Sequence, residues 1–161
     1  MILEPFEFAQ KIPSMRALIG LDYGTKTIGV AMSDRMWTIA SASHVVERKK
    51  FGQDASALME FVTKHEVGGI VVGYPKNMDG SDGPRVQSTT AFVYNLMKLW
   101  CENCPPIMYW DERLSTVEAE RAMIHGDMSR KKRSEKIDAV AAAIILQGAL
   151  DRLSGLKTSQ P

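Results

Sequence analysis

The feature that most restricts the fold lies near the start of the chain, where a short turn joins two apolar stretches. Residues 17–21 and 27–32 are rich in apolar and β-branched side chains, as expected for buried strands. Gly24 lies in the link, and because glycine adopts a positive φ without steric cost, we predict a tight hairpin there. The first strand ends in Asp22. A buried carboxylate needs water, hydrogen bonds or a cation, so Asp22 marks a candidate site.

The chain has the size and composition of one soluble domain. It contains 161 residues, of which 45% are hydrophobic and 24% are charged. Its longest apolar run, residues 139–146, is shorter than the roughly 20 residues that a membrane span requires. The first eight residues carry acids where a signal peptide would carry Lys or Arg. We therefore expect a cytoplasmic protein that does not associate with membranes.

Beyond the hairpin, the hydrophobic pattern alternates between strand and helix. An antiparallel hairpin sheet that is extended by strand–helix units predicts an α/β fold, with a mixed sheet covered by helices. We expect one domain over residues 17–153, an irregular extension over residues 1–16 and a flexible tail over residues 154–161. The further predicted strands are residues 42–46, 69–73 and 106–110, and residues 74–84 are predicted to form a loop. The predicted helices are residues 54–66, 85–100, 115–126 and 134–153. Asp54 is the expected N-cap of the first of these helices, and a capping box at Ser115 marks the start of the third.

Three further acids are candidates to join Asp22. Asp111 and Glu112 directly follow the fifth predicted strand, and ligands collect at the carboxyl ends of strands in α/β sheets. Successive strand residues point to opposite faces, so only one of the two is expected to face Asp22, and the spacing does not decide which. Asp138 shares a helical stripe with Ala141 and Ile145, which places it toward the core. A favourable charge at a helix start is the alternative role of Asp138.

Carboxylates from separate elements, without a His or Cys ligand set, suit hard cations such as Mg²⁺ or Mn²⁺. Their mutual repulsion would be severe without a cation. Two ions held by carboxylates can activate a water and stabilise the leaving oxygen when a phosphodiester is cleaved. We therefore expect metal-dependent phosphodiester hydrolysis. The expected catalytic residues and metal ligands are Asp22, Asp111, Glu112 and Asp138.

Basic residues near these acids are candidates to bind phosphate. The net charge is only +1, so the local distribution is more informative than the total. A basic run directly precedes the helix that carries Asp138 and could hold substrate phosphates beside the metals. A second run, residues 48–50, is interpreted as ordinary solvated surface. The expected substrate-binding residues are Thr25, Lys26, Lys76, Asn77, Arg113, Arg130, Lys131, Lys132 and Arg133, although Thr25, Lys26, Lys76 and Asn77 could equally serve only to shape their turns.

The two cysteines, Cys101 and Cys104, form an isolated pair in a Cys-x-x-Cys spacing. A zinc site usually needs a second pair or nearby histidines, and the three histidines are scattered. We expect reduced thiols at the end of a helix.

Four blocks of the sequence, in order, resemble the YqgF family of Holliday-junction-resolvase-like proteins. They are Gly20–Val30, Val72–Gly80, Asp111–Ala119 and Lys136–Leu146. The resemblance implies a ribonuclease-H-like fold, with a five-stranded mixed sheet (three antiparallel strands, then parallel ones) and metal-dependent nuclease action. The family's proposed substrates are the 5′ end of pre-16S ribosomal RNA and four-way DNA junctions. Asp22, the Asp111–Glu112 pair and Asp138 fall on the family's acidic positions.

The resemblance leaves several functions open. We favour processing of the pre-16S rRNA 5′ end during ribosome biogenesis, which a monomer could perform. Holliday-junction resolution is the first alternative, and it requires two active sites and hence a homodimer. A non-catalytic RNA-binding factor for ribosome assembly is the second. A nucleotide-binding domain of the actin and sugar-kinase type is disfavoured, because such proteins pair two domains of this kind.

Overall fold

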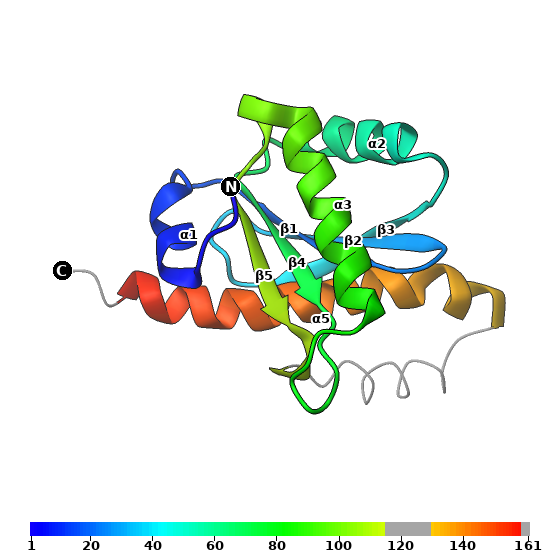
Figure 1. Ribbon diagram of the computed structural model, residues 1–161. Coiled ribbons are helices and arrows are strands. Elements are labelled where there is room, and N and C mark those ends of the chain that lie inside the picture. Colours follow the sequence, from blue (N-terminus) through cyan, green and yellow to red (C-terminus); the bar gives the residue numbers. More distant parts are fainter. Residues whose placement is uncertain (115–129, 159–161) are drawn as a thin grey trace.

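The computed structural model describes residues 1–114 and 130–158, and their centre is a five-stranded sheet (Figure 1). The strands lie in the order β3-β2-β1-β4-β5. β1, β2 and β3 are antiparallel neighbours, whereas β4 and β5 run parallel to β1. The mixed α/β sheet predicted from the sequence is therefore confirmed. The bounds of the strands are β1 Leu18–Tyr23, β2 Thr27–Ser33, β3 Ala40–Glu47, β4 Gly69–Tyr74 and β5 Ile107–Asp111.

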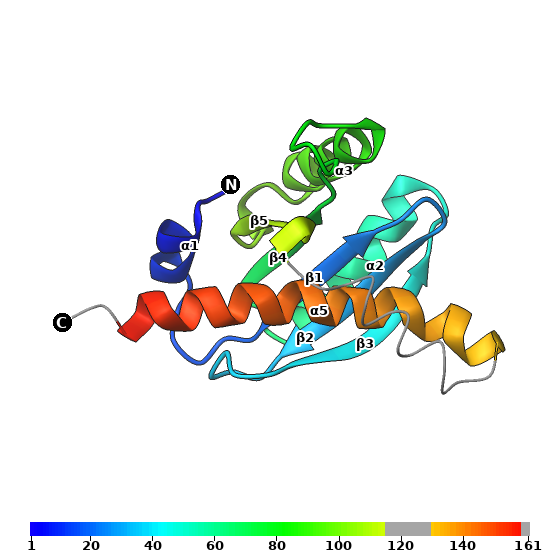
Figure 2. The ribbon, with the colours of Figure 1, turned by 90° about the horizontal axis from the view of Figure 1, so that it is seen from below.

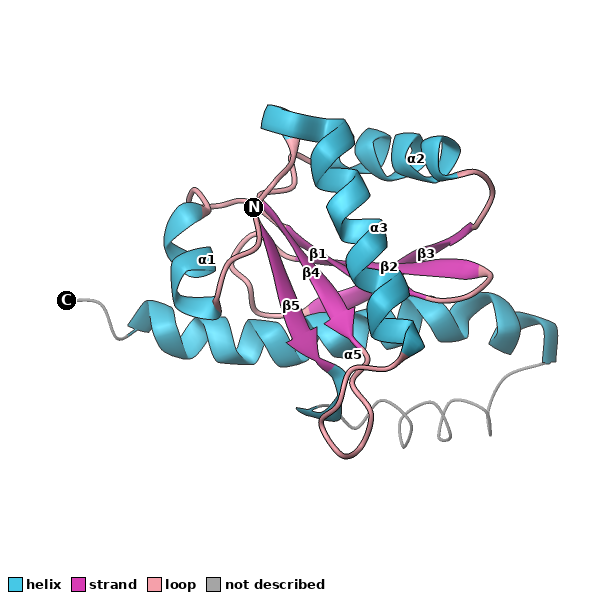
Figure 3. Ribbon diagram, in the orientation of Figure 1, coloured by secondary structure: helices cyan, strands magenta, loops and turns pink. Residues whose placement is uncertain are grey.

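Helices cover both faces of this sheet (Figure 3). On one face, α2 (Phe51–Lys64) and α3 (Pro84–Trp100) pack against apolar side chains of the strands. The other face is crossed by the long helix α5 (Arg130–Thr158), and α1 (Pro5–Lys11) lies beside the C-terminal part of α5 (Figure 2). Each face has its own apolar core. The sheet is thus the middle of three layers.

Helix α5 lies unusually close to the sheet because glycines face it. A Cβ atom on Gly29 of β2 would lie 1.8 Å from the carbonyl oxygen of Asp138. A Cβ atom on Gly20 of β1 would lie 2.8 Å from the carbonyl oxygen of Ala142. Neither position has room for a larger residue, so the backbone of α5 rests on the backbone of the strands. This contact fixes where the residues of α5 lie relative to β1 and β2.

The N-terminal segment is more ordered than the sequence suggested. The prediction of an irregular extension is wrong for residues 5–11, which form α1, and Phe8 and Ile12 are buried in the core beneath α5. Ile2 forms a parallel bridge with Ile107 of β5. The backbone N–H of Leu3 donates to the carbonyl oxygen of Ile107 at 2.8 Å. These first residues therefore belong to the domain.

Two local predictions about residue roles are also wrong. Gly24 does not adopt a positive φ; it is needed because a Cβ atom there would lie 2.9 Å from the carbonyl oxygen of Thr27. Asp54 is not an N-cap, since α2 begins at Phe51 after Lys50, and Asp54 is buried within the helix. Its carboxylate accepts a hydrogen bond from the backbone N–H of Lys49 at 2.9 Å.

The last helix is longer than predicted. It extends over residues 130–158 instead of 134–153, so residues 154–158 of the expected tail are helical. Its segment Ile137–Leu156 has the length and mean hydropathy (1.4) of a membrane span. Ala141 and Leu146 of this segment are nonetheless buried against the sheet, as in the core helix of a globular domain. The helix expected over residues 115–126 lies outside the described residues.

Candidate functional site

Asp22 is almost completely buried near the carboxyl end of β1, with 4% of its surface exposed. Alternate residues of a strand share a face, so Asp22 faces the same way as Leu18 and Gly20. Leu18 belongs to the core beneath α5, and Gly20 lies against α5 itself. Asp22 therefore points toward the face that α5 crosses.

Two glycines lie level with Asp22 on the neighbouring strands. Gly29 of β2 is its antiparallel partner. Gly73 of β4 lies one residue beyond the pair formed by Leu21 and Val72, which places it beside Asp22 on the other side. Because glycine has no side chain, both positions leave space next to the Asp22 carboxylate. Each space is taken by an element that carries another acid.

Asp138 of α5 lies over Gly29 and contacts the hairpin. Its carboxylate oxygen Oδ2 accepts a hydrogen bond from the hydroxyl of Thr27. Thr27 is two residues before Gly29 on β2, so both face α5. Thr27 and Asp138 are 111 residues apart in the sequence. The structure therefore brings Asp138 to the strand next to that of Asp22. No local sequence pattern predicts this contact between Thr27 and Asp138.

Glu112 lies over Gly73, on the other side of Asp22. A Cβ atom on Gly73 would lie 2.6 Å from Glu112 Oε1 and 2.6 Å from the Cδ1 atom of Ile145 in α5. Glu112 starts a short 3₁₀ turn, Glu112–Leu114, at the end of β5. Its carboxylate thus lies on the α5 face of the sheet, level with Asp22.

Asp111 faces differently from Glu112. Trp110 packs against Gly148 of α5, so Asp111, the next residue of β5, points to the opposite face. Its carboxylate is held by the guanidinium of Arg113, with 2.6 Å between Nη2 and Oδ2 and 3.1 Å between Nε and Oδ1. These hydrogen bonds from Arg113 lower the pKa of Asp111. The sequence did not decide which of Asp111 and Glu112 faces Asp22. In the structure, Glu112 lies on the same face as Asp22, and Asp111 lies on the opposite face.

The three acids lie in a row across three strands rather than around one point. Neighbouring strands are about 4.8 Å apart, so β4 beneath Glu112 and β2 beneath Asp138 are separated by roughly 10 Å, with β1 and Asp22 between them. Among the side chains that the structure describes (residues 1–114 and 137–156), no three His, Cys, Asp or Glu residues gather closely enough to hold one metal ion. The donors are nonetheless all carboxylate oxygens, which is the set that Mg²⁺ and Mn²⁺ prefer.

The hairpin turn beside Asp22 is held by Arg48. Thr25 and Lys26 are exposed on this turn. The guanidinium of Arg48 donates to the carbonyl oxygens of Gly24 at 2.7 Å and Thr25 at 3.0 Å. It also lies 4.4 Å from the centre of the Tyr23 ring, a cation–π contact. Arg48 is exposed, as expected for residues 48–50, but it also joins the segment before α2 to the hairpin.

The remaining predicted phosphate-binding residues occupy two other places. Lys76 lies 3.8 Å from the Asp82 carboxylate, and the side-chain amide of Asn77 donates to the Ser81 hydroxyl at 3.1 Å, so both contribute to the shape of their loop. Arg113 lies at the end of β5 beside this loop. The first turn of α5 consists of Arg130, Lys131, Lys132 and Arg133, whose side chains lie outside the described part of the structure.

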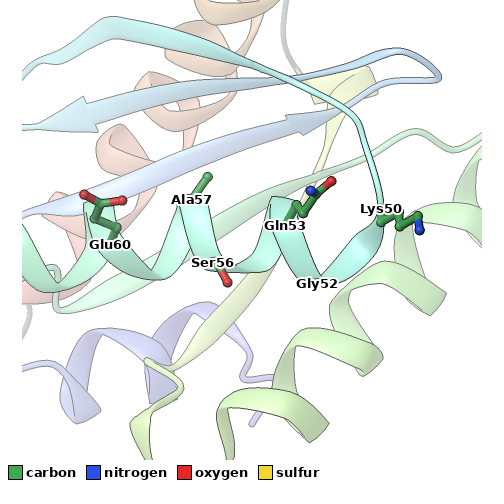
Figure 4. Close-up of a pocket in the computed structure, with 6 residues that line it drawn as sticks. All are labelled: Lys50, Gly52, Gln53, Ser56, Ala57 and Glu60. Atoms are coloured by element: carbon green, nitrogen blue, oxygen red, sulfur yellow. The ribbon is translucent and has the colours of Figure 1, made fainter.

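Two other features lie away from the acids. Cys101 directly follows α3, as predicted, and burial raises the pKa of the Cys104 thiol. A shallow hollow lies along α2, between Lys50, Gln53 and Glu60 (Figure 4). Helix α2 covers the face of the sheet opposite to α5, so this hollow does not include Asp22.

This fold is that of the ribonuclease-H-like Holliday junction resolvases. The chain superposes with a TM-score of 0.56 on a structure described as Thermus thermophilus RuvC in complex with Holliday junction substrate, covering 88% of this chain and 97% of that one at 15% identity. It superposes with a TM-score of 0.55 on the yeast mitochondrial Holliday junction resolvase Ydc2, covering 96% and 86% of the two chains at 13% identity.

The chain belongs to the RuvX family, whose model is described as Holliday junction resolvase and matches residues 16–152. A relative from Jannaschia sp. (strain CCS1) is 63% identical over 151 residues, which is 94% of each chain. A relative from Ruegeria sp. (strain TM1040) is 52% identical over 160 residues, covering 99% of this chain and all of the other. Both relatives carry the name "Putative pre-16S rRNA nuclease". The family resemblance stated from the four sequence blocks is confirmed.

Proposed function

We propose that the protein is a divalent-metal-dependent nuclease that processes the 5′ end of pre-16S rRNA. The observation that carries this proposal is the row of three carboxylates, in which buried Asp22 lies between two glycines that are covered by Glu112 and by Asp138. The names of the close relatives support the choice of substrate.

The proposed ligands of the cations are Asp22, Glu112 and Asp138. Bound Mg²⁺ or Mn²⁺, in one or two sites, would polarise the scissile phosphate and lower the pKa of an attacking water. The protein supplies carboxylates whose repulsion the cations relieve. Asp111 serves a different purpose in this proposal, because it orients the Arg113 guanidinium at the end of β5. Phosphates of the substrate are bound by Arg113, by the hairpin residues Thr25 and Lys26, by Lys76 and Asn77 of the β4–α3 loop, and by Arg130, Lys131, Lys132 and Arg133 of α5.

Resolution of four-way DNA junctions is the second candidate function. The description of the family model and the shared fold of RuvC favour it. Junction resolution cuts two strands and therefore requires a homodimer, whereas trimming of one RNA end is possible for a monomer. We place either activity in the cytoplasm.

The decisive experiment offers purified protein, with Mg²⁺ or Mn²⁺, a labelled pre-16S rRNA leader and a labelled four-way junction side by side. Asp22→Asn is expected to abolish cleavage while nucleic-acid binding is retained or improved, because a repulsive charge is removed. Asp54→Asn is the matched control, since Asp54 is an equally buried carboxylate on the opposite side of the sheet. Full cleavage by Asp22→Asn would contradict the assignment of this site, and wild-type protein that binds the RNA but cleaves neither substrate would favour a non-catalytic RNA-binding factor.

A further inference from the structure

Thr27 is the described side chain that connects the hairpin to the acid on α5. Its hydroxyl donates to Oδ2 of Asp138, and this bond is half-buried between β2 and α5. We propose that Thr27 is a positioning residue, which holds the Asp138 carboxylate in the orientation that binds the cation. The inference rests on the proposed function and assigns a role within the same site.

The bond depends on the close approach of α5 to the sheet. A threonine hydroxyl is only two bonds from its Cα atom, so it reaches only groups that lie directly above the strand. Gly29, two residues further along β2, allows the backbone of Asp138 to rest on the sheet. Thr27 and Gly29 therefore act together: the glycine sets the height of the helix, and the threonine sets the direction of its carboxylate.

The hydrogen bond has a direct consequence for ligand geometry. An aspartate side chain on a helix has several rotamers, and a donor on a neighbouring element selects one of them. The bond uses Oδ2, so Oδ1 would be the oxygen that coordinates a cation. The β-branched threonine is itself stiff at χ1, so the donor is held in place by its own strand. Groups that orient a ligand in this way typically change metal affinity by about 10-fold to 100-fold when they are removed.

The test measures Mn²⁺ binding by isothermal titration calorimetry to the wild-type protein, Thr27→Val, Thr27→Ser and Asp138→Asn. Valine has the shape of threonine without its hydroxyl, so we expect Thr27→Val to bind Mn²⁺ about 10-fold to 100-fold more weakly. Serine retains the donor and should restore the affinity to within a few-fold of wild type. The matched control is Thr90→Val on α3, which removes a half-buried hydroxyl that binds the Val86 carbonyl far from the acids; its Mn²⁺ affinity should equal that of the wild type.

Two outcomes would overturn the inference in different ways. If the wild type binds Mn²⁺, Asp138→Asn weakens it and Thr27→Val does not, the positioning role is refuted while the metal site stands. If the wild type itself binds no Mn²⁺, the proposed metal site fails, and the role of Thr27 fails with it. Melting temperatures of all variants distinguish a loss of affinity from a loss of folded protein.

Discussion

The two faces of the sheet are built in different ways. On the face covered by α2 and α3, the strands present large side chains such as Ile19, Leu21 and Val72, which separate the helices from the strands. On the face crossed by α5, glycines replace side chains at the contact, and the helix backbone rests on the strands. The acids of the proposed site all lie on this second face.

The contrast between the two faces shows how one sheet can serve two purposes. Large interdigitated side chains provide apolar burial, and burial is the main source of stability. A backbone contact provides less burial but defines the helix position closely, because there is no flexible side chain to absorb a shift. We therefore expect mutations in the apolar core of the first face to change stability alone and mutations at the helix contact of the second face to change chemistry as well.

The largest effect is a loss of unfolding free energy, expected for Leu96→Ala on the first face. Leu96 of α3 is fully buried, and replacing such a leucine by alanine typically costs about 2–5 kcal/mol of unfolding free energy. Urea denaturation measures this loss, and Leu99→Ala, at a position that is 55% exposed, is the control. Mn²⁺ affinity of the folded Leu96→Ala protein should be unchanged. A large change in affinity would show that the two faces are not independent.

The next largest effect separates the neighbouring acids Glu112 and Asp111 by activity. Glu112→Gln removes a proposed ligand and should lower the cleavage rate by at least about 100-fold, since groups that only orient a ligand typically contribute about 10-fold to 100-fold. Asp111→Asn only weakens the anchoring of Arg113 and should lower the rate by less than about 10-fold. Single-turnover cleavage measures both variants. The reverse order of the two effects would move the ligand to Asp111.

A smaller effect is expected for Gly29→Ala on the second face. The added methyl group would meet the Asp138 carbonyl, so α5 must shift, and overpacking of this kind costs about 1–3 kcal/mol. Cleavage should fall as well, because Asp138 moves with the helix. Gly52→Ala is the matched control, since a Cβ atom there would point into open space and meet no other described part of the chain. Unchanged cleavage by folded Gly29→Ala protein would contradict the importance of the helix position.

The smallest effect concerns pH and the pair of Asp111 with Arg113. The pKa of Asp111 is lowered in the folded protein by the hydrogen bonds from Arg113, from an ordinary value of 3.8. The pair therefore stabilises the fold above that ordinary value, and its contribution is lost as the pH falls toward the folded pKa. Melting temperatures between pH 6 and pH 3 should decline less steeply for Arg113→Gln than for the wild type. Parallel curves would mean that the pair adds nothing to stability.

Much of this arrangement could be predicted from the sequence because it depends on local patterns. Apolar runs gave the five strands, and the hydrophobic stripe of the last helix placed Asp138 toward the core. The choice between Asp111 and Glu112 required knowing where β5 ends and which face its residues take. The bond between Thr27 and Asp138 depends on how closely α5 approaches the sheet, which no local pattern encodes. Phe8 within α1 and Ile12 just after it mark the buried side, which is too short a pattern to distinguish from a loop.

The first three residues have a consequence for how this protein behaves in concentrated solution. Ile107 of β5 receives the N–H of Leu3 on its carbonyl oxygen and donates its own N–H to the carbonyl oxygen of Met1 at 2.9 Å. The edge strand β5 is thus already hydrogen-bonded at Ile107 to the backbone of the chain's first residues. An edge strand with unpaired backbone N–H and C=O groups can pair with strands of other molecules and so start aggregation. Covering the edge prevents this pairing. Residues 1–3 therefore help to keep the molecules apart, and changes there should favour aggregation before they affect the acids.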